Sequence, residues 1–195
     1  MAQPCEVAGT IEADTPLTGP LSNSACVAYT YQVTREYEED VTTTDEHGKT
    51  KTETEQRSET ASNDERRTRF FVRDATGRVL IDPTDAELDL VDSGTRFDPA
   101  QRTALTRTRT LGHRHQEQSL AVGTSVYILG CVVDGQGQPM IGRSPKDRKR
   151  KFFISRRSER ELAGAAASAA RNWYYGAAGA GALGLVLLVI GIVRL

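Results

Sequence analysis

Cysteine is scarce in this sequence, and the few cysteines are far apart. Cys5, Cys26 and Cys131 are the only three among 195 residues, with no Cys-x-x-Cys pair and no Cys–His cluster. This excludes a zinc finger built from this chain alone and gives no disulfide framework, as is typical of a reducing cytosol. Catalytic signatures are also missing, because no G-x-S-x-G, P-loop or dinucleotide-binding motif occurs. We find no active site in the sequence and expect no cofactor and no metal ion.

The N-terminus lacks the features of a targeting segment. Residues 1–14 read MAQPCEVAGTIEAD, with neither a basic region nor an apolar core. They therefore predict neither a signal peptide nor a first membrane span.

Charged side chains are absent from one long stretch at the C-terminal end. From Tyr174 to Val193 none occurs, and about 20 apolar residues are what an α-helix needs to cross a bilayer. Trp173, Tyr174 and Tyr175 stand at one end, where aromatic rings prefer the headgroup level, and Arg194 stands at the other. A buried core helix is the alternative, but such helices are usually shorter and carry a polar face. We predict a transmembrane anchor over 173–195.

The segment before this anchor has a helical pattern of its own. Ser158 followed by Glu161 is a capping-box pattern, and the Ala-rich run after it has high helix propensity. We expect a juxtamembrane helix over 158–172 that continues into the span. Small residues at i, i+4 and i+8 permit close helix–helix approach and a homodimer through the membrane; they are Gly176, Ala180 and Gly184.

Charge is distributed very unevenly along the chain. Residues 1–141 carry 14 Lys and Arg against 23 Asp and Glu, whereas residues 142–195 carry 11 against 3. Basic residues just before a span favour a cytoplasmic location for the part that precedes it, so we expect a tail-anchored, single-pass protein with its soluble domain in the cytoplasm. Attraction to anionic lipid explains the basic run more simply than nucleic-acid binding does. The candidate headgroup contacts are Lys146, Arg148, Lys149, Arg150 and Lys151.

The residues before the basic run indicate a mainly β domain over 1–157. Alternating or apolar patterns predict strands at 5–13, at 27–33 and at 126–133. RFFVRD and RVLIDP flank Ala-Thr-Gly, so residues 69–83 predict a hairpin in which Gly77 is available for a positive φ. Together with strands near 139–143 and 151–157, this gives about six to eight short strands in a small barrel-like or sandwich domain.

Residues 35–68 form a tract rich in Glu, Thr and Asp with almost no large apolar side chain. Such a tract cannot bury enough surface to offset its ordering entropy, so it is either a mobile loop or an exposed β-ribbon that turns near His47 and Gly48. The Thr-x-Thr alternation favours the ribbon.

Two patterns leave an alternative open. His113 and His115 would share a face of a strand and could bind a metal, but a third protein ligand is not evident, which favours a solvated strand edge. Cys131 paired with a histidine could be a nucleophile, but its position inside VYILGCVV favours a small buried hydrophobe. Residues 91–111 are ambiguous, and we expect a loop there.

Four stretches in order resemble the GIDE domain of membrane-bound proteins classed with the mitochondrial E3 ubiquitin ligases. They are PLSNSACVAYTYQV, FFVRDATGRVLIDP, EQSLAVGTSVYILG and FFISRRSERELAG, beginning at Pro20, Phe70, Glu117 and Phe152. The resemblance implies a mostly β domain held beside a membrane.

This chain departs from that family pattern in two ways. Members of the family often carry a membrane helix before the domain, and the ligases end in a RING finger, which needs eight Cys and His ligands. We find neither in this sequence and expect that ligase activity does not transfer. We therefore expect a non-catalytic protein-interaction or regulatory module. The protein partner is not identified by the sequence, and a component of ubiquitin-like conjugation is one candidate.

Overall fold

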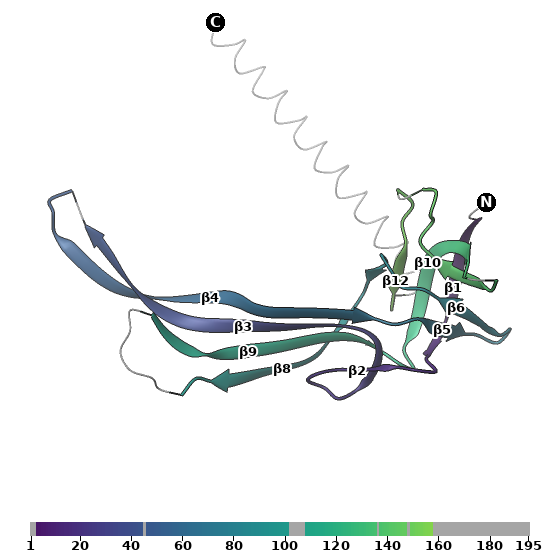
Figure 1. Ribbon diagram of the computed structural model, residues 1–195, viewed down its shortest axis with the longest axis horizontal. Helices are drawn as coiled ribbons and strands as arrows, with labels where there is room; N and C mark the ends of the chain where they lie inside the picture. Colours follow the sequence, from purple (N-terminus) through teal and green to yellow (C-terminus); the bar gives the residue numbers. More distant parts are fainter. Residues whose placement is uncertain (1–2, 45, 102–107, 136, 148, 158–195) are drawn as a thin grey trace, which may run out of the picture. The chain divides into compact units, whose positions relative to one another are not determined.

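The computed structural model describes residues 3–44, 46–101, 108–135, 137–147 and 149–157. The chain divides into two compact units, Met1–Arg156 and Arg157–Leu195, and of the second unit only Arg157 is among the described residues. The described part consists of strands joined by turns (Figure 1). They are β1 Gln3–Glu12, β2 Leu17–Thr18, β3 Ala25–Thr44, β4 Thr50–Arg67, β5 Phe70–Arg73, β6 Arg78–Ile81, β7 Glu87–Leu88, β8 Val91–Pro99, β9 Thr108–Ala121, β10 Ser125–Asp134, β11 Pro139–Gly142 and β12 Phe153–Ser155.

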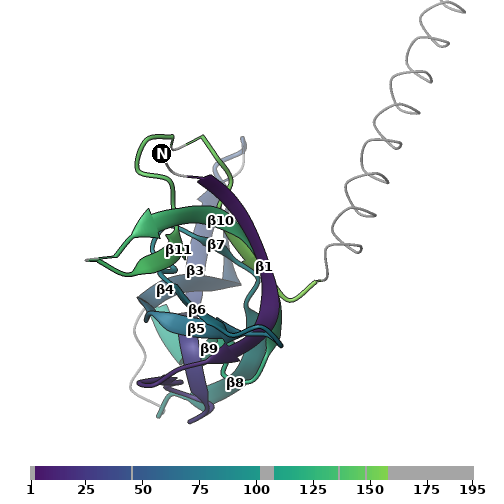
Figure 2. The same cartoon turned by 90° about the vertical axis from the view of Figure 1, so that its right-hand side faces the viewer.

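Five strands close into a small barrel in the order β1–β5–β6–β11–β10, and β10 returns to β1. β1 closes the ring because its residues 3–10 pair with β10 while residues 10–12 pair with β5, as Figure 2 shows. Alternate side chains of β1 are partly or fully buried, among them Val7 and Ile11, so the strand has the period of 2 expected of a sheet with one buried face.

Gly9 lies where β1 passes from β10 towards β5. A Cβ at this position would collide with the carbonyl oxygen of Arg73 and would lie 2.8 Å from Cγ1 of Val72. Glycine is therefore required by the close approach of two backbones at the point of closure.

The other sheet is open. Its order is β2–β3–β9–β8, and β4 pairs with β3. It shares one core with the barrel, because Val27, Ala28 and Leu120 of this sheet belong to the same buried cluster as the barrel residues. The other members come from the barrel, from β12, which pairs with β10, and from loops; they are Ile11, Phe70, Val72, Ile81, Ala86, Val126, Ile128, Ile141, Phe152 and Ile154.

β3 and β4 continue together far beyond this core. Their antiparallel register runs from Ala28–Arg67 to Thr44–Thr50, with one irregularity between Val33 and Thr34. β9 accompanies β3 only as far as Glu39, so the last part is a two-stranded ribbon, which Figure 1 shows. The prediction of a β-ribbon over 35–68 is confirmed, as is a turn that includes Gly48 at φ 77°.

The hairpin of residues 69–83 is also confirmed, with β5 and β6 paired and Gly77 at φ 155°. Two other predictions are wrong. The described strands number twelve rather than six to eight, and two of them are long, with 20 and 18 residues. The loop expected over 91–111 is instead β8 at Val91–Pro99 and the start of β9 at Thr108; residues 102–107 lie outside the described part.

Among the described residues no helix has the length and apolar character needed to span a membrane. The predicted juxtamembrane helix over 158–172 and the predicted anchor over 173–195 lie outside the described residues. The same holds for Trp173, Tyr174, Tyr175 and Arg194, and for the small-residue face of Gly176, Ala180 and Gly184.

Candidate functional site

The two fully buried cysteines lie in strands and behave as small hydrophobic residues. Cys26 is 0% exposed and Cys131 is 3% exposed. Burial, and then the nearby charge of Glu117, raise the pKa of the Cys26 thiol, which keeps it protonated and makes it a poor nucleophile. Cys131 lies in β10 of the barrel, as expected of the buried-hydrophobe interpretation.

His115 makes polar contacts with side chains of both neighbouring strands. Its Nδ1 lies 2.6 Å from the hydroxyl of Tyr31, and its Nε2 lies 3.2 Å from Oδ2 of Asp98. The first contact is a hydrogen bond, and the second lies within ion-pair distance. The described residues contain no group of three His, Cys, Asp or Glu side chains placed to hold a metal ion. The expectation of a solvated strand edge is wrong, because β9 pairs with β3 on one side and β8 on the other.

Glu117 is a carboxylate with 0% exposure that holds a neighbouring loop. It accepts hydrogen bonds from the backbone N–H of Leu21 at 2.6 Å and of Ser22 at 3.1 Å, and from the Ser22 hydroxyl at 2.6 Å. A Cβ on Gly19 would collide with its Oε1. Glu117 thus fixes the connection between β2 and β3 against the open sheet, and no lysine or arginine takes part in these bonds.

Asp74 and Asp82 stabilise their own turns. The hydroxyl and then the backbone N–H of Thr76 bond to Asp74 and lower the pKa of its carboxyl. Burial alone would raise the pKa of Asp82, but hydrogen bonds from Thr84 and the guanidinium of Arg69 outweigh it, and the net pKa is lowered. These carboxylates stabilise the turns in which they lie.

Two arginines hold the turn that follows Asp82. Arg67 donates to the carbonyl oxygens of Pro83 and Ala86 at 3.0 and 2.7 Å, and Arg143 donates to that of Asp85 at 2.8 Å. The shallow depression between them is lined by Arg67, Asp85, Ala86 and Arg143. Both arginines already donate hydrogen bonds to backbone carbonyls there, so their role at this depression is to stabilise the turn.

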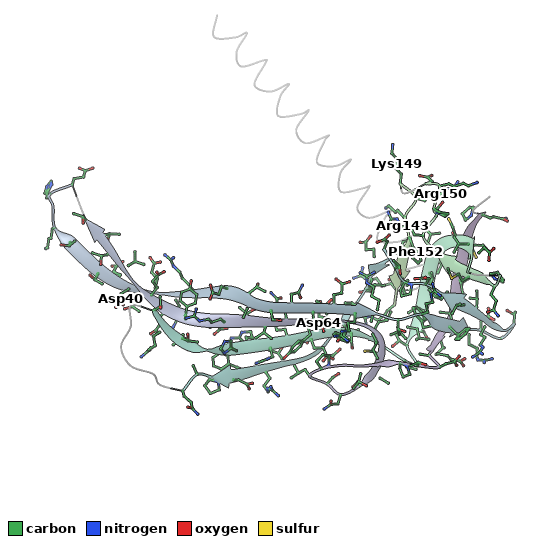
Figure 3. All side chains as sticks on the ribbon, in the orientation of Figure 1. Asp40, Asp64, Arg143, Lys149, Arg150 and Phe152 are labelled. Atoms are coloured by element: carbon green, nitrogen blue, oxygen red, sulfur yellow. The ribbon has the colours of Figure 1, made fainter. Side chains whose placement is uncertain are left out.

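The largest exposed feature of the described domain is the ribbon formed by residues 36–59 of β3 and β4 with their connecting turn. It carries nine Asp and Glu against three Lys and Arg. β4 is exposed along nearly its whole length, on both alternations of the strand. Ion pairs such as Arg57–Glu39 at 3.0 Å and Arg109–Glu38 at 2.6 Å join the strands, but exposed pairs of this kind stabilise a fold little. Asp40 lies on this ribbon and Asp64 nearer the core (Figure 3).

A basic segment connects β11 to β12. Lys149 and Arg150 extend outward from it (Figure 3), while Phe152 at its end is 4% exposed and packs in the core. Arg150 forms an ion pair with Asp147 at 3.3 Å. Within the described part of the chain no ion pair involves Lys146, Lys149 or Lys151. Four of the five predicted headgroup contacts therefore lie on one exposed connection, and Arg148 is outside the described residues.

A closed small barrel, an attached open sheet and a long polar ribbon make up the described β domain. The family model for GIDE, described as E3 ubiquitin ligase, matches residues 38–190, which is more than three quarters of the chain. The chain belongs to this family, which confirms the resemblance and supports a ubiquitin-ligase-related role. Three of the four resembling stretches lie inside the matched range. No curated protein and no solved structure gives a significant match.

Sequence reasoning missed Glu117 altogether, and it singled out His115 without finding the partners that the side chain has in the open sheet. Glu117 and His115 lie in HRHQEQSL, a stretch with no alternation of apolar and polar residues. Their partners Ser22, Tyr31 and Asp98 come from other strands and loops, so no local pattern marks them. The only signal was that Glu117 begins one of the stretches that resemble the family.

We predict that Glu117→Gln destabilises the domain by about 1–3 kcal/mol, because the amide cannot accept all three bonds and brings its own N–H groups against donors. Unfolding by urea, followed by circular dichroism, measures this. The matched change Gln116→Ala, on the exposed neighbour, should leave the free energy of unfolding within about 0.5 kcal/mol of the original. Equal stability of Glu117→Gln and the original chain would contradict the role assigned to this carboxylate.

Proposed function

We propose that this chain is a membrane-anchored GIDE-domain protein that acts as a non-catalytic protein-interaction or regulatory module. Its described domain would bind a protein partner through the ribbon of residues 36–59. The predicted anchor over 173–195 would hold the domain at the cytoplasmic face of a membrane. Family membership supports the ubiquitin-ligase-related setting of this role.

The ribbon is the observation that carries this proposal. Its side chains are exposed or only partly buried, and Tyr37 and Val41 are its only large apolar residues. Ordering each of its residues costs about 1–2 kcal/mol of backbone entropy, and the exposed ion pairs return little of that cost. A long ribbon that contributes so little to the core is best explained by the binding of a partner outside the domain.

Membrane attachment is supported by the basic segment together with the sequence that follows it. Lys146, Lys149 and Lys151 lie on one exposed connection and form no ion pair with the described residues. Phe152, at the end of this connection, is buried in the core. Each basic residue near an anionic surface contributes on the order of 1 kcal/mol of attraction. The segment would therefore rest on anionic headgroups when the predicted anchor is inserted.

A second candidate function follows from the family match. The chain could serve as an accessory subunit of an E3-ligase-like system whose RING part is on another chain. The two functions differ in the partner that contacts the ribbon. A RING-bearing or activating-enzyme-like protein would favour the accessory subunit, and self-association without such a partner would favour a scaffold.

We predict that shortening the ribbon abolishes partner contact without unfolding the domain. In the variant, residues 41–53 are replaced by Asn-Gly, a two-residue hairpin turn that joins the paired residues Asp40 and Thr54. Its thermal midpoint should stay within a few degrees, because the removed side chains are not part of the core. Crosslinking in intact membranes, followed by quantitative mass spectrometry, should lose the partners seen with the full chain.

The control for this experiment keeps the ribbon and replaces Thr42, Thr43 and Thr52 by serine. It should retain every partner, because length, hydroxyl groups and charge are unchanged. If the shortened chain captures the same partners in the same amounts, the ribbon is not the binding surface and the proposed function loses its support.

We predict that anionic lipid shields the lysines of the basic segment. The full chain is reconstituted into vesicles of neutral lipid and of neutral lipid with phosphatidylserine, and a neutral amine-reactive reagent labels its lysines. Labelling of Lys146, Lys149 and Lys151 should fall several-fold in the anionic vesicles. Lys51 on the ribbon, with a side chain 74% exposed, is the internal control. Unchanged labelling at the three lysines would remove the proposed headgroup contact.

A further inference from the structure

β8 is the last strand of the open sheet, and in the described part of the chain it pairs only with β9. The backbone N–H of Ala100 donates to the carbonyl of Leu111 at 2.8 Å, so residue 100 faces β9. Because backbone groups alternate between the two sides of a strand, those of Phe97 and Thr95 face away from β9. These residues present a row of backbone groups at the open edge.

The same strand concentrates exposed apolar surface. Of the three large hydrophobic side chains that are exposed among the described residues, Val91 and Phe97 lie on β8, at 37% and 40%. Phe97 packs over Gly112, where a Cβ would collide with its ring, and beneath the guanidinium of Arg114 at 5.6 Å. This packing holds the ring in one place at the edge and leaves part of it in contact with water.

Two opposite charges flank Phe97 on the strand. Arg96 and Asp98 are two positions apart and therefore share a face of the sheet. They form an ion pair at 3.0 Å within their own strand, with side chains 58% and 48% exposed. The run Arg-Phe-Asp is thus apolar at its centre, basic on one side and acidic on the other.

We propose that a second copy of this chain binds at this edge, with the two β8 strands antiparallel about a two-fold axis at Phe97. In this register Phe97 lies opposite the partner's Phe97, and Arg96 lies opposite the partner's Asp98 twice, once in each direction. Directly opposite aromatic pairs and opposite-charge pairs stabilise antiparallel strands. The surface is self-complementary, as an isologous interface requires.

Two features confine the pairing to this short run. The register shifts between Asp92 and Gly94, and Pro99 has no N–H to donate. About five residues from each copy can pair, which is less than the interface of a stable dimer. The dimer is therefore weak and forms at high local concentration. It depends on neither the ribbon nor the predicted anchor, because β8 belongs to neither.

Charge reversal tests the register. Arg96→Asp places two acids opposite each other twice in the homodimer, and Asp98→Arg places two bases opposite each other twice. A mixture of the two variants restores both opposite-charge pairs, and so does the double variant R96D/D98R. The full chain is labelled at its N-terminus with donor or acceptor dye, and energy transfer is measured in excess detergent micelles over a range of concentrations.

The control is Arg66→Asp on β4, at the other edge of the sheet. Arg66 also forms an ion pair two positions away on its own strand, with Asp64 at 3.3 Å, so the same charge change is made outside the proposed interface. Because Asp98 also contacts His115, the thermal midpoint of each variant is measured. Arg96→Asp carries the test alone if Asp98→Arg does not fold.

We expect concentration-dependent energy transfer in the original chain and in Arg66→Asp. Self-association of each single reversal should fall roughly tenfold to a hundredfold, since two attractive pairs become repulsive. Their mixture and the double variant should return to within a few-fold of the original. The proposal is overturned if the original chain does not self-associate, or if Arg96→Asp associates as well as the original. It is also overturned if the folded variants associate no better mixed than alone.

Discussion

The fold depends on one close approach of two backbones, where β1 leaves β10 and reaches β5 at Gly9. This contact closes a ring of five strands and leaves the barrel with no open edge between β1 and its neighbours. A closed barrel removes the unpaired backbone groups through which sheets associate. Two short strands, β7 and β2, are also end strands, but the long open edges of the described domain are in the second sheet, on β4 and β8. The protein surfaces proposed for partners lie there.

β3 connects the two parts of the domain and changes character along its length. Its first residues, including Val27 and Ala28, belong to the core, whereas Thr42 to Thr44 are exposed. The first part of β3 thus belongs to the core, and its last part is one strand of the exposed ribbon. Hydrophobic burial stabilises only the first part of β3. The order of the ribbon therefore comes from backbone hydrogen bonds between β3 and β4 and from cross-strand side-chain pairs.

The elements that sequence patterns predicted are those with local signals. The 69–83 hairpin is marked by Gly77 between two apolar runs, the strand at 126–133 by its continuous apolar run, and the ribbon by its Thr-x-Thr alternation. β8 and β9 were missed for a physical reason. Their inner face is partly polar, and its groups are satisfied across the sheet, His115 by Tyr31 and Asp98, and Glu117 by the loop of Leu21 and Ser22. These hydrogen bonds join residues up to 96 positions apart, so they leave no periodic pattern in the sequence.

The basic segment was located from the sequence by charge alone, but its geometry was not. Phe152 is buried in the core, and Arg150 forms an ion pair with Asp147. Lys146, Lys149 and Lys151 form no ion pair within the described part of the chain. Arg67 and Arg143 donate hydrogen bonds to backbone carbonyls of the turn that precedes β7. The depression beside this turn is therefore lined by side chains that stabilise the fold.

The central claim is that the closed barrel and its core stabilise the domain, whereas the ribbon contributes little to stability. Hydrogen exchange of the full chain, followed residue by residue, tests this claim most directly. The account predicts that amides of β1, β10 and the first third of β3 exchange only through global unfolding. Amides of residues 40–44 and 50–54 should exchange at least about a hundredfold faster, through local opening of the ribbon. Equal protection of the ribbon and the barrel in the isolated protein would contradict it.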